Sequence, residues 1–204
     1  AVGSPLWCLY GLFGYEGMMI LIADHPDLAA RAGQRLAHNA CQQVRRIAAL
    51  GADAVWIEEC LTDQISPEAF ASINVPLVRQ CVDEIRRCGL RSIYYYCGNP
   101  MDRLHHILGV GADAVHFEER KKAFTIDIED VAATIDGQCT LFGNLDSIGI
   151  LQDGSDAALR SDVLRQMRAA ARNRGRFVMS TGSPITPGTP VSRVKLYTDL
   201  VREY

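Results

Sequence analysis

The sequence lacks any run of basic residues and any Lys- or Arg-rich tail. Its formal net charge of -3 and its pI near 6.0 give no sign of the positively charged surface that binds nucleic acid or an anionic membrane. The longest apolar run near the N-terminus, residues 17–23, is too short to span a bilayer and has no basic flank of the signal-peptide kind. We therefore expect a soluble protein with neither a nucleic-acid nor a membrane partner.

The sequence also lacks a C-x-x-C pair. Its seven cysteines, an odd number, are scattered through segments of helical or extended pattern, which argues against a disulfide framework and against a zinc finger. Such a distribution of cysteines favours a reducing, cytoplasmic location. With 48% hydrophobic residues among 204, the chain has enough apolar surface for a large core. One domain over residues 1–204 is the expected organisation.

An internal repeat is the most informative feature that is present. Residues 51–59 (GADAVWIEE) recur sixty residues later as residues 111–119 (GADAVHFEE). Two βα units of about thirty residues account for this offset. A third apolar segment, residues 91–97, lies between the two copies. Three strands separated by helices predict a parallel sheet.

Helix signals lie between and after these strands. Each predicted helix combines a start signal, either proline or a capping serine, with apolar residues at helical spacing. Pro76 should break or kink the second helix midway. The predicted starts are Pro26, Pro67, Ser155-Asp156 and Pro190.

Further strands are expected at residues 139–143 and 176–180, and an N-terminal apolar segment, residues 5–12, supplies a sixth. A closed barrel of this kind needs eight strands and roughly 250 residues. We therefore expect an α/β fold of the (β/α)8 TIM-barrel type, present as an N-terminally truncated fragment with about six βα units. An open doubly wound sheet is the alternative, but residues 11–14 do not match its dinucleotide fingerprint.

Barrels of this type carry their active sites at the C-terminal ends of the strands. The polar residues that close each predicted strand are therefore candidates, and together they bring carboxylates, a thiol, amides and hydroxyls to one end. They are Glu58-Glu59, Tyr95 to Asn99, Glu118 to Arg120, Gly143 to Asp146, and Ser180 to Ser183.

Alternation along the strands indicates which of these side chains share a face. It turns Glu58 into the barrel and, by the same parity, His116 and Glu118, while Tyr95 and Cys97 share one face. Carboxylates crowded in a barrel mouth repel one another, which raises at least one pKa and provides a general acid near neutrality. Glu118 is the predicted acid/base residue.

Each candidate also has a structural explanation, and these alternatives stay open. Glu-Glu pairs end strands because they are solvated there, which applies most to Glu59 and Glu119. A histidine in mid-strand, such as His116, is more often a satisfied core residue than a base. Cys97 fits an inert buried thiol as well as a ligand or nucleophile.

Five short segments occur in order along the chain: Gly3 to Pro5, Ile65 to Phe70, Cys97 to Asn99, Gly143 to Asp146, and Gly182 to Pro184 followed by Thr189-Pro190. With these segments the sequence resembles the uroporphyrinogen decarboxylase family, which includes the corrinoid-dependent methyltransferases, over essentially the whole chain. The resemblance implies the C-terminal three-quarters of a (β/α)8 barrel whose mouth receives a tetrapyrrole or the methyl-bearing end of a corrinoid (cobalamin), as substrate or methyl carrier.

The methyltransferase branch carries a His-x-Cys motif on one strand and a distant Cys near the last, which together bind zinc. In this sequence Cys97 stands at the first Cys position, Tyr95 replaces the His, and Ser183 replaces the second Cys. Hydroxyls are poor zinc ligands beside imidazole and thiolate, so ordinary zinc chemistry is not expected unless another side chain substitutes. The candidates for substitution are Glu58, Glu118 and His116.

The decarboxylase branch is matched no more closely. It has His after the glycine where this chain has Ser183, and its first-strand tyrosine has only Tyr10 as an approximate counterpart. The Cys97-Gly98-Asn99 element favours the methyltransferase branch. We expect the substrate-binding residues to be Tyr10, Asn99, His116, Asn144 and Ser183.

Three functions follow as hypotheses. The first is methyl transfer involving a corrinoid, with a small-molecule or tetrapyrrole substrate and a corrinoid protein as partner. The second is decarboxylation of a porphyrinogen side chain, for which Asp146 or Glu118 would favour the protonated pyrrole. The third is a non-catalytic ligand-binding domain. Unpaired strand edges in a truncated barrel predict self-association into a homo-oligomer. The expected catalytic set is Glu118, Glu58, Asp146, Tyr95 and Cys97.

Overall fold

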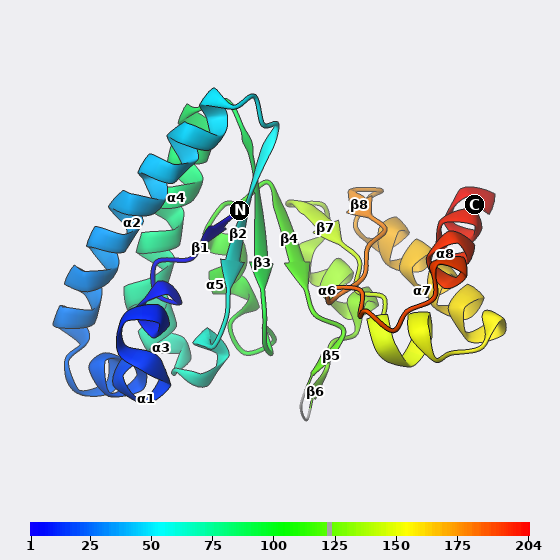
Figure 1. Ribbon diagram of the computed structural model, residues 1–204, viewed down its shortest axis with the longest axis horizontal. Helices are drawn as coiled ribbons and strands as arrows, with labels where there is room; N and C mark the ends of the chain where they lie inside the picture. The colour runs from blue at the N-terminus through cyan, green and yellow to red at the C-terminus, as the bar shows by residue number, and fades with distance from the viewer. Residues whose placement is uncertain (122–123) are drawn as a thin grey trace. The chain divides into compact units, whose positions relative to one another are not determined.

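A computed structural model of the protein describes residues 1–121 and 124–204 (Figure 1). The chain forms two compact units, residues 1–115 and 116–204. Strand β4 (Ala114–Phe117), which lies within the second copy of the sequence repeat, crosses the division between them.

The first unit is built on parallel strands that lie in sequence order. Strand β2 pairs with β1 on one side and with β3 on the other. A doubly wound sheet reverses its strand order after the first strands, so this order favours the barrel-type arrangement. The strands are β1 (Val2–Gly3), β2 (Ala54–Glu59) and β3 (Arg91–Tyr96).

Helices cover the sheet of the first unit. Figure 1 shows α2 and α4 side by side on one side of β2 and β3, and α2 also packs against α1. Pro26 stands at the start of α2, as predicted from the sequence. The helices are α1 (Cys8–Asp24), α2 (Pro26–Ala49), a 3₁₀ turn η1 (Thr62–Gln64), α3 (Pro67–Ala69), α4 (Val75–Arg87) and α5 (Leu104–Gly109).

The strand predicted at residues 5–12 is wrong. Only Val2 and Gly3 pair with β2, and the chain is helical from Cys8. An unbroken apolar run does not distinguish a strand from a buried helix, and here the helix buries four apolar side chains. Those side chains are Leu9, Met18, Leu21 and Ile22.

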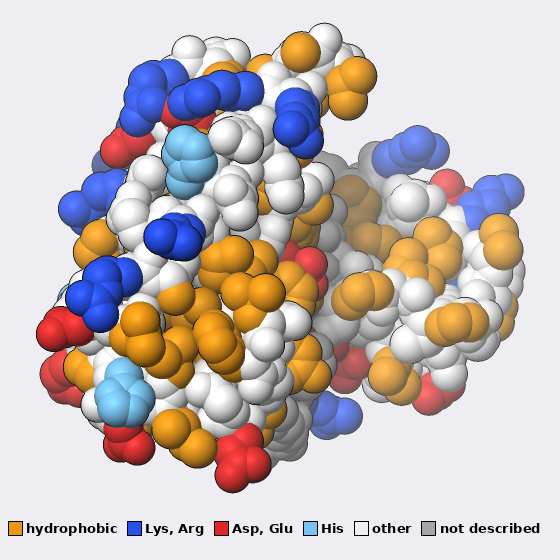
Figure 2. All heavy atoms as spheres, turned by 60° about the vertical axis from the view of Figure 1, so that its left-hand side comes forward, with side chains coloured by type: hydrophobic (Ala, Val, Ile, Leu, Met, Phe, Trp, Pro, Cys, Tyr) orange, Lys and Arg blue, Asp and Glu red, His pale blue; other side chains and the backbone are white. Residues whose placement is uncertain are grey.

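The other side of α1 is exposed and apolar. Figure 2 shows hydrophobic side chains gathered over the region of the first unit where α1 lies. Five large side chains of this helix are exposed: Tyr10, Leu12, Phe13, Tyr15 and Ile20.

Near Pro76, where the sequence predicted a break or kink, the helix continues but changes its hydrogen-bond pattern to that of a π-helix. Ser66 caps the first turn by accepting a hydrogen bond from the backbone N–H of Ala69 at 3.1 Å. A π-helical segment, η2 (Phe70–Asn74), then separates α3 from α4. Pro76 lies in the first turn of α4, where its missing N–H leaves no hydrogen bond unmade.

The second unit combines a parallel pair, β7 and β8, with a short antiparallel hairpin, β5 and β6, that the sequence did not predict. Helix α7 packs against α6 and α8. Its elements are β5 (Arg120–Lys121), β6 (Phe124–Thr125), α6 (Ile128–Ile135), β7 (Thr140–Phe142), η3 (Ser147–Gln152), α7 (Asp156–Arg172), β8 (Phe177–Val178) and α8 (Val191–Glu203).

The core of the second unit forms where the faces of α7 and α8 meet the loop after β7. Its buried members are Leu145, Leu151, Leu159, Val163, Tyr197 and Leu200. None of the helices in the described part of the chain has both the length and the hydrophobicity that crossing a membrane requires.

Replacing the cap of α7 should weaken the second unit. The Ser155 hydroxyl accepts a hydrogen bond from the backbone N–H of Ala158 at 3.1 Å. Ser155→Ala should lower the free energy of unfolding by about 1 kcal/mol in urea titration, and Ser155→Asp should preserve it. Ser161→Ala, at an exposed position inside the same helix, is the matched control and should not destabilise. Equal effects of the two alanine substitutions would contradict the capping role.

Candidate functional site

In the first unit, one face of β2 and β3 carries several of the predicted site residues. The register pairs Glu58 with Tyr95. The rings of Trp56 and Tyr95 lie 5.3 Å apart between centroids. Because alternate side chains share a face, Cys97 lies on the same side as Tyr95. The predicted shared face of Tyr95 and Cys97 is therefore consistent with the register.

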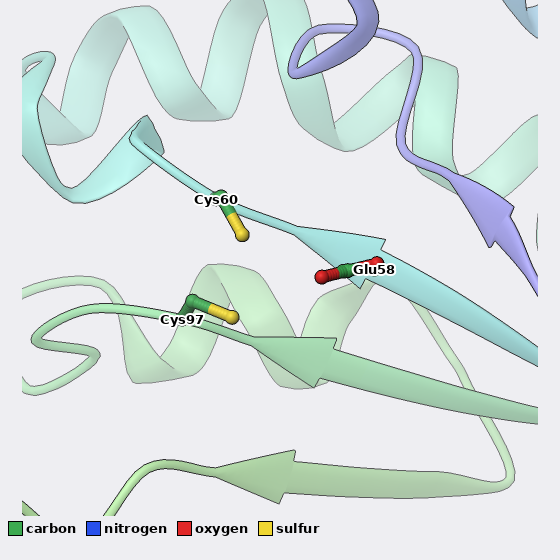
Figure 3. A group of neighbouring side chains, drawn as sticks. All are labelled: Glu58, Cys60 and Cys97. Carbon is green, nitrogen blue, oxygen red and sulfur yellow. The ribbon is translucent and has the colours of Figure 1, made fainter. Parts of the chain in front are cut away.

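Three potential ligand groups converge just beyond these strand ends. The sulfur atoms of Cys60 and Cys97 and a carboxylate oxygen of Glu58 all lie within 4.8 Å of one another, and each residue is half-buried. Figure 3 shows the two sulfurs and the carboxylate directed into one common space. The backbone N–H of Cys97 donates to the carbonyl oxygen of Glu59 at 2.8 Å, which extends the strand register to Cys97.

A glycine is required directly after Cys97. Gly98 has a φ of 129°, and a Cβ at this position would lie 2.4 Å from the carboxyl carbon of Asp63. An L-residue here would be strained and would collide with Asp63. Gly98 therefore lets the chain turn away while Cys97 stays at the end of the strand.

The opposite face of β2 holds a fully buried carboxyl, Glu59. It accepts hydrogen bonds from the Ser4 hydroxyl at 2.6 Å, the Asn74 amide at 2.6 Å and the Tyr94 hydroxyl at 2.9 Å. Burial raises its pKa to about 7, although these donors favour the charged form and oppose the rise. The simple explanation that Glu59 is solvated at the strand end is wrong.

In the second unit His116 is a buried, hydrogen-bonded strand residue. Its Nε2–H donates to the carbonyl oxygen of Thr181 at 2.9 Å, and its ring lies 5.7 Å from that of Phe142. Burial lowers its pKa to about 4, so the imidazole is neutral at neutral pH. These contacts favour a structural or hydrogen-bonding role over that of a cationic group.

Glu118 and Glu119 are both buried, at 1% and 9% exposure, so neither is a solvated strand end. The Ser183 hydroxyl donates to the Glu119 carboxylate at 3.1 Å. Burial raises the pKa of Glu119, with Asp146 and Glu118 adding to the rise as nearby negative charges. A Cβ on Gly182 would lie 2.6 Å from the backbone nitrogen of Glu119, so only glycine allows this approach.

Asn144 and Asp146 line a cavity of about 280 Å³ in the second unit, together with Glu119, Arg120 and Arg165. Asp146 caps η3 by accepting from the backbone N–H of Gly149 at 2.8 Å, and it lies 3.8 Å from the Arg120 guanidinium. The cavity is therefore lined by both carboxylates and guanidinium groups, and Arg165 forms an ion pair with Asp162 at 2.7 Å.

Two predicted substrate-binding residues of the first unit are exposed to solvent. Tyr10 is on the exposed side of helix α1, and Asn99 is exposed, with its side-chain oxygen accepting from the Met101 N–H at 3.1 Å. Sequence reasoning missed Cys60. The signal was available, because Cys60 follows Glu58 by two residues and so falls on the same strand face.

The whole chain, residues 1–204, matches the family model described as uroporphyrinogen decarboxylase (URO-D). The chain belongs to the uroporphyrinogen decarboxylase family, as the resemblance indicated.

Relatives and a solved structure support this assignment. The chain is 24% identical over 153 residues to a uroporphyrinogen decarboxylase of Gloeobacter violaceus, covering 74% of this chain and 42% of that protein. It is 25% identical over 210 residues to one from a Synechococcus species, covering 99% and 55%. The chain thus spans about half the length of the curated relatives it matches.

A methyltransferase from Methanosarcina mazei has a similar fold. The TM-score is 0.85 at 18% sequence identity, over 99% of this chain and 58% of that one. Together with the parallel strands joined by helices, this likeness confirms the predicted barrel-type α/β fold.

The neutral state of His116 predicts a pH dependence of stability. Its pKa is lowered from 6.5 to about 4 in the folded protein. The stability that depends on the neutral imidazole is thus present above pH 6.5 and is lost as pH falls toward 4, by up to about 1.4 kcal/mol per pH unit. His116→Gln, which keeps an N–H donor, should remove this component. Urea unfolding between pH 7.5 and 4.5 should then show a shallower loss for the variant than for the wild type, and equal slopes would contradict the buried neutral histidine.

Proposed function

We propose that this protein transfers methyl groups, as an enzyme of the corrinoid-dependent branch of its family. The observation that carries the proposal is the convergence of two thiols and a carboxylate at the ends of β2 and β3. A porphyrinogen decarboxylase needs neither a thiol nor a metal, whereas thiolates are good ligands for zinc, which activates a thiol acceptor for attack on a methyl group.

The proposed reaction moves a methyl group from a methylated corrinoid to a small acceptor thiol. The acceptor loses its proton, its sulfur forms a bond to the methyl carbon, and the cobalt–carbon bond breaks with both electrons left on the corrinoid. Tyr95 and Trp56 would form an apolar floor beside Glu58 and Cys97. A corrinoid protein is the proposed partner.

The residues of the second unit would serve substrate binding and proton transfer. Glu118 is the proposed acid/base residue, because it is buried at a strand end. Asn144 and Asp146 would bind polar substrate groups in the cavity that they line, and Ser183 is a further proposed substrate-binding residue. His116, held by Thr181, would position rather than transfer protons.

Decarboxylation of a porphyrinogen is the second candidate. The curated relatives carry that name, and the second unit holds carboxyl groups, including Glu118 and Asp146, that would stabilise a protonated pyrrole. This alternative gives no role to the two thiols of the first unit.

The two candidates make different products. The protein incubated with methylcobalamin and a panel of small thiols should lose the methyl-cobalt absorption and form a methyl thioether, detected by mass spectrometry. Uroporphyrinogen in a parallel incubation should release no carbon dioxide. Release of carbon dioxide from uroporphyrinogen without thioether formation would instead establish the decarboxylase.

Substitution of Glu118 tests the acid/base role in whichever reaction is found. Glu118→Gln should lower kcat by at least about a hundredfold with little change in melting temperature, because general acid/base catalysis contributes about 10²–10⁴ in rate. Glu119→Gln is the matched control on the neighbouring position and should leave kcat nearly unchanged, since the amide oxygen still accepts from Ser183. If Glu119→Gln alone were damaging, the assignment of the two carboxyls would be reversed.

A further inference from the structure

Two buried cysteines face each other between the helices that cover the sheet of the first unit. Cys41 lies on α2 and Cys81 on α4, with 5% and 0% of their surfaces exposed. The thiol of Cys81 donates a hydrogen bond to the sulfur of Cys41. The thiol of Cys41 in turn donates to the carbonyl oxygen of Gln80 at 3.8 Å. The two sulfur atoms are therefore neighbours in the packed interior.

The packing of α2 on α4 brings the two cysteines together (Figure 1). On one side of the pair, Gly33 leaves room for Leu77, because a Cβ at Gly33 would lie 2.4 Å from a methyl carbon of Leu77. On the other side, Arg45 forms an ion pair with Glu84 at 2.6 Å. The helices thus approach closely on both sides of the cysteine pair, as a disulfide between them requires.

The two thiols of the pair differ in acidity. The pKa of Cys41 is lowered, chiefly by the hydrogen bond from Cys81, although burial and the charge of Glu84 oppose this effect. The positive charges of Arg45 and Arg87 lower it further. The hydrogen bond to Cys41 and burial raise the pKa of Cys81. Because the thiolate is the attacking species in disulfide exchange, Cys41 is the nucleophile of the pair and Cys81 the second thiol.

From this arrangement we infer that Cys41 and Cys81 are a redox-sensitive modification site, which a small-molecule disulfide of the glutathione type converts into a disulfide between α2 and α4. The Cys41 thiolate attacks one sulfur of the small disulfide and releases one small thiolate. Cys81 then loses its proton and attacks the Cys41 sulfur, which forms the bond between the two cysteines and releases the second small thiolate. The released thiolates take up the two protons that the cysteines lose. The small disulfide is thereby reduced to two thiols as the cysteines are oxidised.

The direction of this exchange follows the redox state of the surrounding thiol pool. In a reducing environment the two cysteines stay as thiols, and they form the disulfide when the pool becomes oxidised. The site therefore goes beyond the proposed methyl transfer, because it responds to the surroundings whichever reaction the protein performs.

Helix α4 connects this pair to the candidate site. It follows directly on η2, whose Asn74 donates to the buried Glu59 carboxylate at 2.6 Å. Glu59 in turn is the neighbour of Glu58 on β2. A covalent bond between α2 and α4 therefore restrains a segment that supports one of the strands of the site.

Peptide mapping tests whether the bond forms. The reduced protein is incubated with oxidised glutathione, its remaining thiols are alkylated, and it is digested with trypsin. Residues 36–45 and 80–86 are tryptic peptides with one cysteine each, and they should appear as one disulfide-linked species that dithiothreitol separates. A bond between Cys60 and Cys97, whose sulfurs also lie near each other, would join a different pair of peptides.

Substitutions separate the roles of the two thiols. Cys41→Ser should abolish the linked species. Cys81→Ser should leave Cys41 as a mixed disulfide with glutathione, because the second thiol is missing. Cys139→Ser is the matched control, since this cysteine is buried to a similar degree, at 6% exposure, in the second unit. It should form the linked species as the wild type does. Circular dichroism of each reduced variant separates loss of a thiol from loss of the fold.

Two physical measurements test the effect of the bond on the protein. The oxidised wild type should melt at least about 5 °C above the reduced protein, because the cross-link restricts the unfolded chain. Amide hydrogen exchange in residues 70–87, which include η2 and α4, should be slower in the oxidised form.

Three outcomes would overturn the inference. They are the absence of the linked peptides from oxidised, folded wild type, a melting temperature that falls on oxidation, and equal hydrogen exchange of residues 70–87 in the two forms. None of these measurements uses enzymatic activity, so failure of the proposed methyl transfer would leave them unchanged.

Discussion

The parallel register between β2 and β3 is the constraint on which the chemistry of the first unit depends. It aligns Glu58 with Tyr95 and Glu59 with Tyr96. Because side chains alternate between faces, one residue of slip would exchange the environments of Glu58 and Glu59. Glu59, now buried, would then face the site. Glu58 would be turned toward the helices, away from Cys97. Any force that holds this register therefore also holds the site.

The hydrogen bonds that Glu59 accepts help to hold this register. Its three donors come from different segments: Ser4 follows β1, Asn74 ends η2, and Tyr94 belongs to β3. A buried carboxyl is tolerated only when its lone pairs are satisfied, so each segment must occupy its place before Glu59 can be buried. The network thus couples the placement of three elements to one residue, next to Glu58, which lies beside the two thiols.

The sequence predicted what depends on local rules and missed what depends on tertiary contacts. The repeat, the alternation and the proline and serine caps correctly predicted the principal strands and the starts of α2, α3 and α7. Residues 5–12 were misassigned because an apolar run carries no period that separates a strand from a helix. Cys60 was missed because it lies outside the family's motif, whose positions in this sequence are Tyr95, Cys97 and Ser183. Its partner Cys97 lies far along the chain, and only the register brings the two together.

The two copies of the repeat show why a role cannot be assigned to a carboxyl from its motif alone. Glu59 and Glu119 end identical Glu-Glu pairs, yet Glu59 accepts from three side chains whereas the Ser183 hydroxyl is the donor that reaches Glu119. Burial raises the pKa of both. Each additional donor stabilises the anion and opposes that rise, so the protonation of each carboxyl depends also on residues outside the repeat. The first glutamates of the two pairs differ as well, because Glu58 lies beside two thiols and Glu118 is fully buried. The same strand-end pattern thus stands in two different chemical environments, one beside two thiols and one buried.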